Sequence, residues 1–340
     1  MHGGLPVANR TDFSGLMRYL VLRVFHAVLL LMAASVLTFL FTALAPGNYF
    51  DEMRLNPQIS AETVSALKSH YDLDKPLPSR YWVWLTSTMH GDMGYSFAYN
   101  SPVLPLLAAR ARNTLLLSMT ATVLSWLIAL PLGIWSAEYI ARWPDRLVGG
   151  ASAVLLVIPD IALALGLLML AVHTRWLPAG GMVSVGRDSL SFAGRMFDLA
   201  RHMLLPVTIL VLSAQPLLVR HVRAAVAETL GAGFILAAEA HGIPRHRLLW
   251  RYALPAAANP LLSLFGFSIG ALLSGSLLVE VVTSWPGLGP FLLEAILARD
   301  LYVVIGGVLL STLFLVAGNF LADLLLFWAD PRIRSERTAN

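Results

Sequence analysis

The side chains best suited to chemistry in this sequence are the histidines and carboxylates that interrupt its apolar stretches. His221, His241 and His246 lie in one polar segment, residues 220–254, at spacings that form no metal site with nearby carboxylates. Histidines in such a setting are expected to face solvent or a partner rather than to bind a metal. The sequence therefore predicts no metal centre and no catalytic residue in this segment.

Motifs for nucleotide chemistry and for hydrolysis are also missing. The two lysines, Lys68 and Lys75, have no glycine-rich neighbours, and no G-x-x-x-x-G-K-[ST] phosphate loop occurs. There is no H-E-x-x-H zinc motif and no G-x-S-x-G nucleophile elbow. We therefore expect a chain that is not an enzyme, holds no cofactor and does not hydrolyse ATP itself.

Two carboxylates lie within apolar stretches, where a charge is costly and usually faces protein or water. Asp160 follows Pro159 about halfway along one stretch, and the proline frees a backbone carbonyl, which favours a kink or a polar cavity. Asp160 is thus a candidate for lining a path across the membrane, with a hydrogen bond between helices as the alternative. Glu280 is a second candidate, although structural pairing is the favoured explanation for it. Because the two lie on different spans at different depths, they do not suggest an intramembrane enzyme.

The composition assigns the chain to a bilayer. Hydrophobic residues make up 57% and charged residues 13%, and the mean hydropathy is +0.69, so the chain lacks the polar residues to cover a soluble core. The net charge of +4 is spread over span ends rather than gathered in one basic run, which argues against nucleic-acid binding. Six windows are long and apolar enough to cross a membrane: 20–45, 114–137, 148–172, 203–219, 255–281 and 303–328. The predicted fold is an all-α, multi-pass bundle of six transmembrane helices.

An even number of spans places both termini on one side of the membrane. Arginines flank the spans closely on that side and are spread over longer loops on the other, so the positive-inside rule makes the termini and segment 220–254 cytoplasmic. Arg18 and Arg23 before an apolar run also resemble a signal peptide, but the run is longer than such a peptide needs and Pro46 follows it. We expect it to be retained as the first membrane helix.

These boundaries divide the chain into five parts. The segment 46–112 is too small for an independent domain and is expected to pack over the outer mouth of the bundle. The expected parts are a cytoplasmic segment 1–19, a first transmembrane helix 20–45, the extracytoplasmic segment 46–112, a five-helix core 113–329 containing the cytoplasmic loop 220–254, and a cytoplasmic tail 330–340.

A stripe of small residues lies on the fifth predicted span. Gly266, Gly270 and Ser274 are spaced four apart, which places them on one helix face and permits close helix approach. The stripe is a helix-packing candidate, either at a seam with a second subunit or within this bundle.

The polar segment 220–254 contains a run of small residues followed by a glycine, which favours contact with a partner protein. Small residues let another protein come close, and glycine permits a left-handed turn that folds the segment back. The pattern reads Leu236-Ala237-Ala238-Glu239-Ala240-His241-Gly242, then nine residues, then Tyr252-Ala253-Leu254-Pro255. This resembles the cytoplasmic coupling loop of ATP-binding-cassette (ABC) importer permeases, E-A-A-x-x-x-G-x9-I-x-L-P, with Leu236 in place of the glutamate and Tyr252 in place of the isoleucine.

Further segments are similar to the dipeptide/oligopeptide/nickel permease family, and specifically to its B-type subunit. The resemblance covers about residues 16–334. It is carried by Tyr71-Asp72-Leu73-Asp74-Lys75-Pro76-Leu77-Pro78, Gly91-Asp92-Met93-Gly94-Tyr95-Ser96, Trp176-Leu177-Pro178 with Gly180, Glu280-Val281-Val282-Thr283-Ser284-Trp285-Pro286-Gly287-Leu288-Gly289 and Asp330-Pro331-Arg332-Ile333-Arg334.

The resemblance implies a subunit of the bacterial inner membrane that works in a complex. Its implied partners are a C-type permease, two cytoplasmic ABC ATPases and an extracytoplasmic solute-binding protein, with peptides or similar small solutes as cargo. ATP binding would close the ATPases, and the helix near 234–241 would pass that motion to the spans. The implied ATPase-coupling residues are Leu236, Ala237, Ala238, Glu239, Ala240 and Gly242, with Arg245 and Arg247 as charge partners. The alternative is a secondary transporter or channel that works without ATP.

Overall fold

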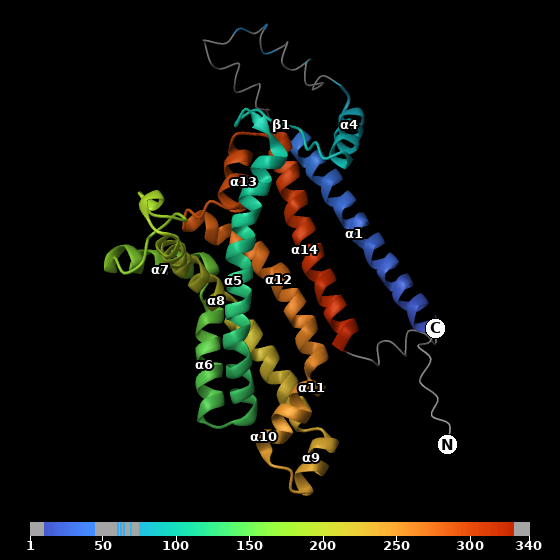
Figure 1. The fold of residues 1–340 in the computed structure, drawn as a ribbon, viewed down its shortest axis with the longest axis vertical. Coiled ribbons are helices and arrows are strands. Elements are labelled where there is room, and N and C mark those ends of the chain that lie inside the picture. Colours follow the sequence, from blue (N-terminus) through green and yellow to red (C-terminus); the bar gives the residue numbers. More distant parts are fainter. Residues whose placement is uncertain are drawn as a thin grey trace.

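The computed structural model describes residues 10–44, 60, 62, 64, 69 and 75–329. These residues form long helices arranged along one axis, with a small group of short elements at each end (Figure 1). In order, the elements are α1 (Arg10–Leu44), α4 (Leu77–Met89), β1 (Tyr95–Ser96), β2 (Ser101–Pro102), α5 (Val103–Glu138), α6 (Trp143–Val157), α7 (Asp160–Thr174), η1 (Arg187–Ser189), α8 (Phe192–Leu230), α9 (Gly233–Ala240), α10 (Arg245–Leu248), η2 (Leu249–Ala253), α11 (Leu254–Ala256), α12 (Ala258–Val282), α13 (Leu288–Leu297) and α14 (Leu301–Ala329).

The prediction of six spans is confirmed when one bent pair counts as a single span. Within the described residues, five helices are long and apolar enough to cross a membrane by length and composition. The pair α6 and α7 passes the same test together, but it bends by 97° at residues 158–159. The predicted window 148–172 is therefore a broken span, because Pro159 cannot donate a backbone hydrogen bond to continue the helix.

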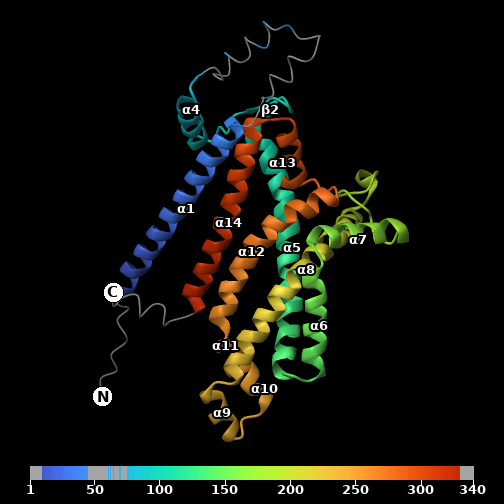
Figure 2. The same ribbon diagram turned by 180° about the vertical axis from the view of Figure 1, so that it is seen from behind.

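The helices are unequally buried. In α8, 67% of the most apolar 18-residue stretch is buried within the chain, against 11% in α1. Helix α8 lies at the centre, packed along α5 and against α6, α7 and α12, whereas α1 contacts α14 and α4 (Figure 2). Two of the buried apolar clusters, around Ile209 and around Val222, lie on α8, so this helix is the spine of the core.

The segment between α1 and α5 contains two short strands as well as helix. Strands β1 and β2 form an antiparallel hairpin of two residues each, with Tyr95 opposite Pro102, that leads directly into α5. Trp84 of α4 packs with Phe39 of α1 and Ile305 of α14. The motif residues 71–74 and 330–334 lie outside the described residues.

Candidate functional site

The part of the polar segment that follows α8, residues 231–254, forms a projection at the end of the molecule opposite β1 and α4 (Figure 1). Helix α8 runs unbroken to Leu230, and the short helix α9 follows after Gly231. Ile235 is buried and anchors α9 to the bundle, whereas its neighbours Phe234 and Leu236 are 52% and 54% exposed. The projection therefore presents apolar side chains away from the chain's own core.

Gly242 ends α9 in the left-handed turn that the sequence pattern predicts. Its φ is +80°, and its amide donates to the Glu239 carbonyl at 2.9 Å. The Ile243 amide donates to the Ala238 carbonyl at 3.3 Å, which closes the helix end. A β-carbon on Gly242 would meet no atom within 4 Å, so the need for glycine comes from the backbone angle rather than from crowding.

The chain returns from the projection through α10 and a π-helical turn, η2. Leu248 and Leu249 are buried there, and Leu249 belongs to the apolar cluster around Val222, so this helical segment is fixed to the core. Helices α11 and α12 then continue into the bundle. Both ends of the projection are thus attached to long helices, α8 and α12. A displacement of α9 would be passed to both.

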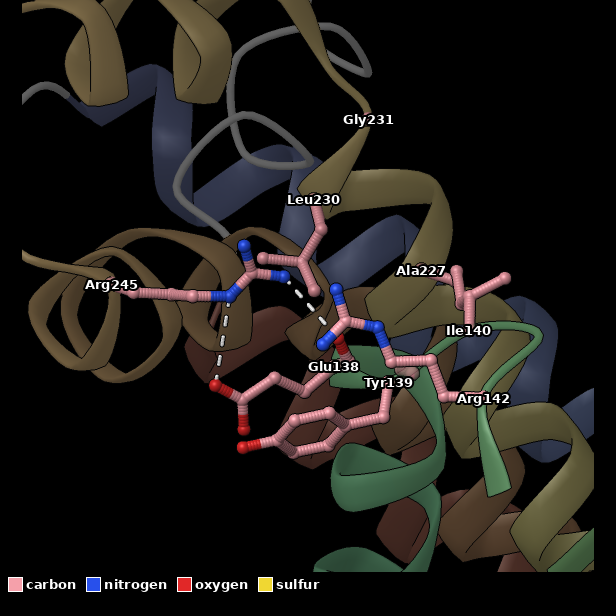
Figure 3. Close-up of a pocket in the computed structure, with 9 residues that line it drawn as sticks. Glu138, Tyr139, Ile140, Arg142, Ala227, Leu230, Gly231 and Arg245 are labelled. Atoms are coloured by element: carbon pink, nitrogen blue, oxygen red, sulfur yellow. Dashed lines mark hydrogen bonds and ion pairs between the residues drawn. The ribbon is translucent and has the colours of Figure 1, made fainter. Parts of the chain in front are cut away.

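Arg245 makes contacts within this chain, which the sequence did not predict. Its Nε lies 3.6 Å from Glu138 Oε1 and its Nη1 lies 3.8 Å from Glu239 Oε1, and its Nη2 donates to the Glu138 carbonyl at 3.2 Å. Arg245 borders a cleft of about 500 Å³ between the ends of α5 and α8 (Figure 3). Arg247 is exposed. Of the two arginines expected to pair with another subunit, Arg245 links α9 and α5, and both are exposed.

A second ion pair lies close by, at the same end of the molecule. Arg223 of α8 donates to both oxygens of Asp145 on α6, from Nε at 2.5 Å and from Nη2 at 2.8 Å. The same carboxylate accepts from Ser136 Oγ on α5 at 2.6 Å and from the Ala141 amide at 2.9 Å. One carboxylate therefore joins three helices. Sequence reasoning missed it, although an aspartate in the first turn after Trp143-Pro144 is a usable signal.

The two carboxylates proposed for a solute path have different surroundings. Asp160 is exposed at the first residue of α7, directly after the break at Pro159. Glu280 is 0% exposed, and its Oε2 accepts from the Gly289 amide at 2.8 Å. A β-carbon on Gly287 would lie 2.5 Å from the Glu280 carboxyl group. Glu280 is therefore enclosed by the turn that follows α12, whereas Asp160 is accessible.

The three small residues of the stripe on α12 do not share one environment. A β-carbon on Gly270 would lie 2.3 Å from Leu315 Cδ1 of α14, so Gly270 allows α12 and α14 to approach closely inside this bundle. Gly266 is also buried, whereas Ser274 is exposed. Within this chain the close packing is made by the glycines, and Ser274 is left for lipid or another subunit.

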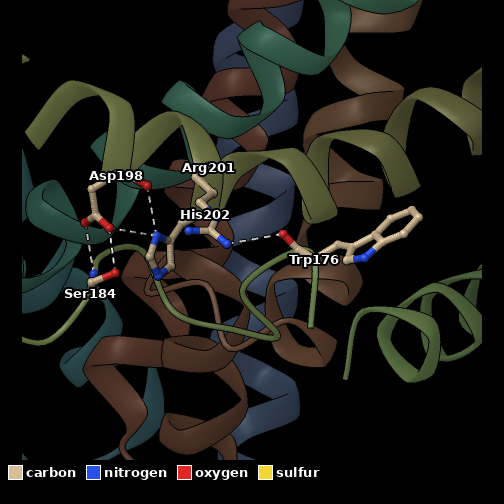
Figure 4. A network of polar contacts seen from close by, with 5 residues as sticks. All are labelled: Trp176, Ser184, Asp198, Arg201 and His202. Carbon is tan, nitrogen blue, oxygen red and sulfur yellow. Dashed lines mark hydrogen bonds and ion pairs between the residues drawn. The ribbon is translucent and has the colours of Figure 1, made fainter. Parts of the chain in front are cut away.

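The loop between α7 and α8 is held by a polar network (Figure 4). Asp198 accepts from the Ser184 amide at 2.9 Å and from Ser184 Oγ at 2.6 Å, and His202 Nδ1 lies 2.8 Å from the Asp198 carbonyl. Arg201 donates to the Trp176 carbonyl at 3.3 Å. The Gly181 amide donates to the Thr283 carbonyl at 3.1 Å, which fastens this loop to the turn after α12.

The hairpin of β1 and β2 is fastened in a similar way. Asp300 is buried between α13 and α14, and its Oδ2 accepts from Ser96 Oγ at 2.6 Å and from the Ala98 amide at 3.1 Å. Burial and a hydrogen bond to Glu294 raise the pKa of the Tyr99 hydroxyl to about 12, so Tyr99 stays protonated as a donor. Sequence analysis did not identify these contacts, because they join residues about two hundred positions apart.

Among the described residues, no group of three histidine, cysteine, aspartate or glutamate side chains could hold a metal ion. The fold combines helices long and apolar enough to cross a membrane, a bent pair, α6 and α7, in the third span, and a short helix, α9, that projects from one end. These features are those of a polytopic membrane protein.

Comparisons with known proteins agree with this class. The family "Binding-protein-dependent transport system inner membrane component" matches residues 129–335, and its N-terminal counterpart matches residues 16–120. The chain belongs to this family and is a multi-pass permease subunit of an ABC importer.

Curated relatives match along nearly their whole length. The oligopeptide transport system permease protein AppB of Bacillus subtilis is 31% identical over 93% of this chain and 98% of its own. The probable D,D-dipeptide transport system permease protein DdpB of Escherichia coli is 32% identical over 92% and 96%. The glutathione transport system permease protein GsiC of Salmonella typhimurium is 31% identical over 94% and 99%.

A solved structure shares the fold. An inward-facing structure of the MetNI methionine ABC transporter superposes with a TM-score of 0.54 at 19% identity, covering 66% of this chain and 96% of the matched chain.

Proposed function

We propose that this chain forms half of the translocation pathway of an importer for peptides or similar small solutes. The support is chemical agreement among its relatives, which are named for oligopeptides, D,D-dipeptides and glutathione, all of them short peptides. The other half is a second, C-type permease subunit, and an extracytoplasmic binding protein delivers the solute to the end that carries β1 and α13.

Two cytoplasmic ABC ATPases drive transport through the projection. The observation that carries this proposal is the exposure of Phe234 and Leu236 at the far end of a continuous 39-residue helix whose centre is buried. Exposed apolar side chains rimmed by polar ones mark a protein interaction site. A short helix held at both ends transmits a push because Ile235, Leu248 and Leu249 are packed into the bundle.

The remaining site residues take roles from their positions. Ala237, Ala238, Glu239 and Ala240 complete the docking surface, and Arg247 is its accessible cation. The chain resides in the bacterial inner membrane with both termini and the projection in the cytoplasm. Asp160, exposed at the break of the third span, contributes a polar group to the solute path.

The experiment is reconstitution of this chain, with the products of neighbouring genes, in proteoliposomes. The proposal predicts uptake of labelled di- and tripeptides that requires ATP, both ATPases and the binding protein. A Walker-lysine variant of the ATPases is the control and should abolish uptake. If the chain alone transports a solute at the same rate without ATPases, it is a secondary transporter or channel and the proposal is wrong.

A further inference from the structure

We propose that Asp145 and Arg223 are positioning residues that make the cytoplasmic ends of α5, α6 and α8 one rigid body. Through this joint, movement of the projection would reach the broken third span. The inference rests on the proposed coupling to ATPases and adds the route by which the motion travels inside this chain.

The joint is built from more contacts than an ordinary surface ion pair. The Asp145 side chain is 11% exposed and accepts four hydrogen bonds, two from the Arg223 guanidinium and one each from Ser136 and the Ala141 amide. Two parallel bonds between a guanidinium and a carboxylate fix direction as well as distance. The donors come from α8, from α5 and from the turn between α5 and α6.

The backbones of α5 and α8 also approach each other closely at this level. A β-carbon on Gly133 of α5 would lie 2.6 Å from Val222 Cβ and 3.1 Å from the Arg223 amide of α8. Ala141 has a φ of +61°, which is uncommon for a residue with a side chain, and Asp145 holds its amide in place. Close packing therefore restrains α5 against α8, and the hydrogen bonds of Asp145 tie α6 to both.

The position of the joint gives it a transmitting role. Arg223 lies seven residues before the end of α8 at Leu230, which is about 10 Å or two helical turns from the start of the projection. Asp145 lies in the first turn of α6, whose other end is the break at Pro159 and the start of α7. A tilt of the end of α8 must carry α6 with it as long as the pair is intact.

The test uses the assembled importer in proteoliposomes and measures solute taken up per ATP hydrolysed. Asp145→Asn and Arg223→Gln should each lower this ratio by about fivefold or more, the range of a coupling free energy between sites. Arg220→Gln removes the same charge from an exposed position three residues earlier and should leave the ratio unchanged. If uptake and ATP hydrolysis fall in the same proportion, the pair only stabilises the fold and the inference is wrong.

A disulfide gives an independent arm, because the chain contains no cysteine. Gly133→Cys with Val222→Cys would join α5 to α8 at the level of the joint after the helices separate by about 1 Å. A rigid joint predicts that oxidation leaves uptake and the ratio of solute taken up to ATP hydrolysed unchanged, because α5 and α8 keep their relative position at this level. A block of transport on oxidation would contradict it, because the joint would then have to open. Wild-type uptake driven by ATP tests the proposed function separately from both arms.

Discussion

Two short segments near opposite ends of this molecule differ in how their side chains are covered. In the turn after α12, Glu280 and Trp285 are fully buried, and Glu280 accepts a hydrogen bond from the Gly289 amide. On α9, in the projection, Phe234 and Leu236 are exposed. The turn after α12 is closed by its own chain, whereas α9 leaves apolar side chains uncovered, and we propose that another protein covers them.

The largest loss of stability should come from a substitution next to the closed turn after α12. Gly289→Val would place a β-carbon 2.2 Å from the Leu277 carbonyl oxygen, and a backbone atom cannot move aside as a side chain can. We expect a loss of about 3 kcal/mol of stability, measured as reduced recovery and a lower unfolding temperature in detergent. Gly275→Val, on the neighbouring helix α12, meets no atom within 4 Å and is the matched control. Equal stability of the two variants would contradict the tight closure.

At the projection, the backbone turn should control coupling rather than folding. Gly242→Val forces a β-branched residue to a φ of +80° with no clash, so the end of α9 must reorient. We expect membrane insertion to be normal and uptake per ATP to fall about tenfold. Gly149→Val, on an open face of α6, should leave both unchanged. Unchanged uptake and stimulated ATPase activity in Gly242→Val would show that this turn does not serve coupling.

Neighbouring residues of α9 sharpen the comparison. Leu236→Asp should leave the unfolding temperature unchanged and weaken ATPase association about tenfold or more, because Leu236 is exposed for contact. Ile235→Ala should instead cost about 2 kcal/mol of stability, because Ile235 fills the core. Co-purification of the ATPases and thermal unfolding measure the two effects. If Leu236→Asp destabilises the isolated chain as much as Ile235→Ala does, the exposed face belongs to the fold.

The smallest effect is expected for Glu280→Gln. The amide oxygen can still accept from the Gly289 amide, and the change replaces an ionisable group at a fully buried site with a neutral one of similar shape. Stability should change by less than about 1 kcal/mol, and uptake should remain normal. Asp160→Asn, at an exposed site, is the matched substitution and should lower uptake. If Glu280→Gln lost uptake while its stability stayed normal, Glu280 would have to be assigned to the solute path after all.

Hydropathy and local patterns were enough to predict much of this structure. Long apolar runs predicted the membrane spans, and Gly242 predicted the left-handed turn at the end of α9, because both features depend on residues close together in the chain. Pro159 predicted a kink in the third span, but its 97° bend depends on how α6 and α7 pack against α8. The joint of Asp145 and Arg223 links residues 78 positions apart, and Ser96 reaches Asp300 across 204. No local pattern encodes such contacts, since they exist only after the helices have assembled.

The central claim is that α9 is held by a separate ATPase. Because the chain has no native cysteine, Leu236→Cys provides a single thiol on α9, and Trp82→Cys provides a control on α4 at the opposite end, where the native side chain is 65% exposed against 54% for Leu236. Treatment of native membranes with a short thiol- and amine-reactive crosslinker should join the ATPase to position 236 and not to position 82. An ATPase that is never captured at position 236, or is captured equally at both positions, would contradict the claim.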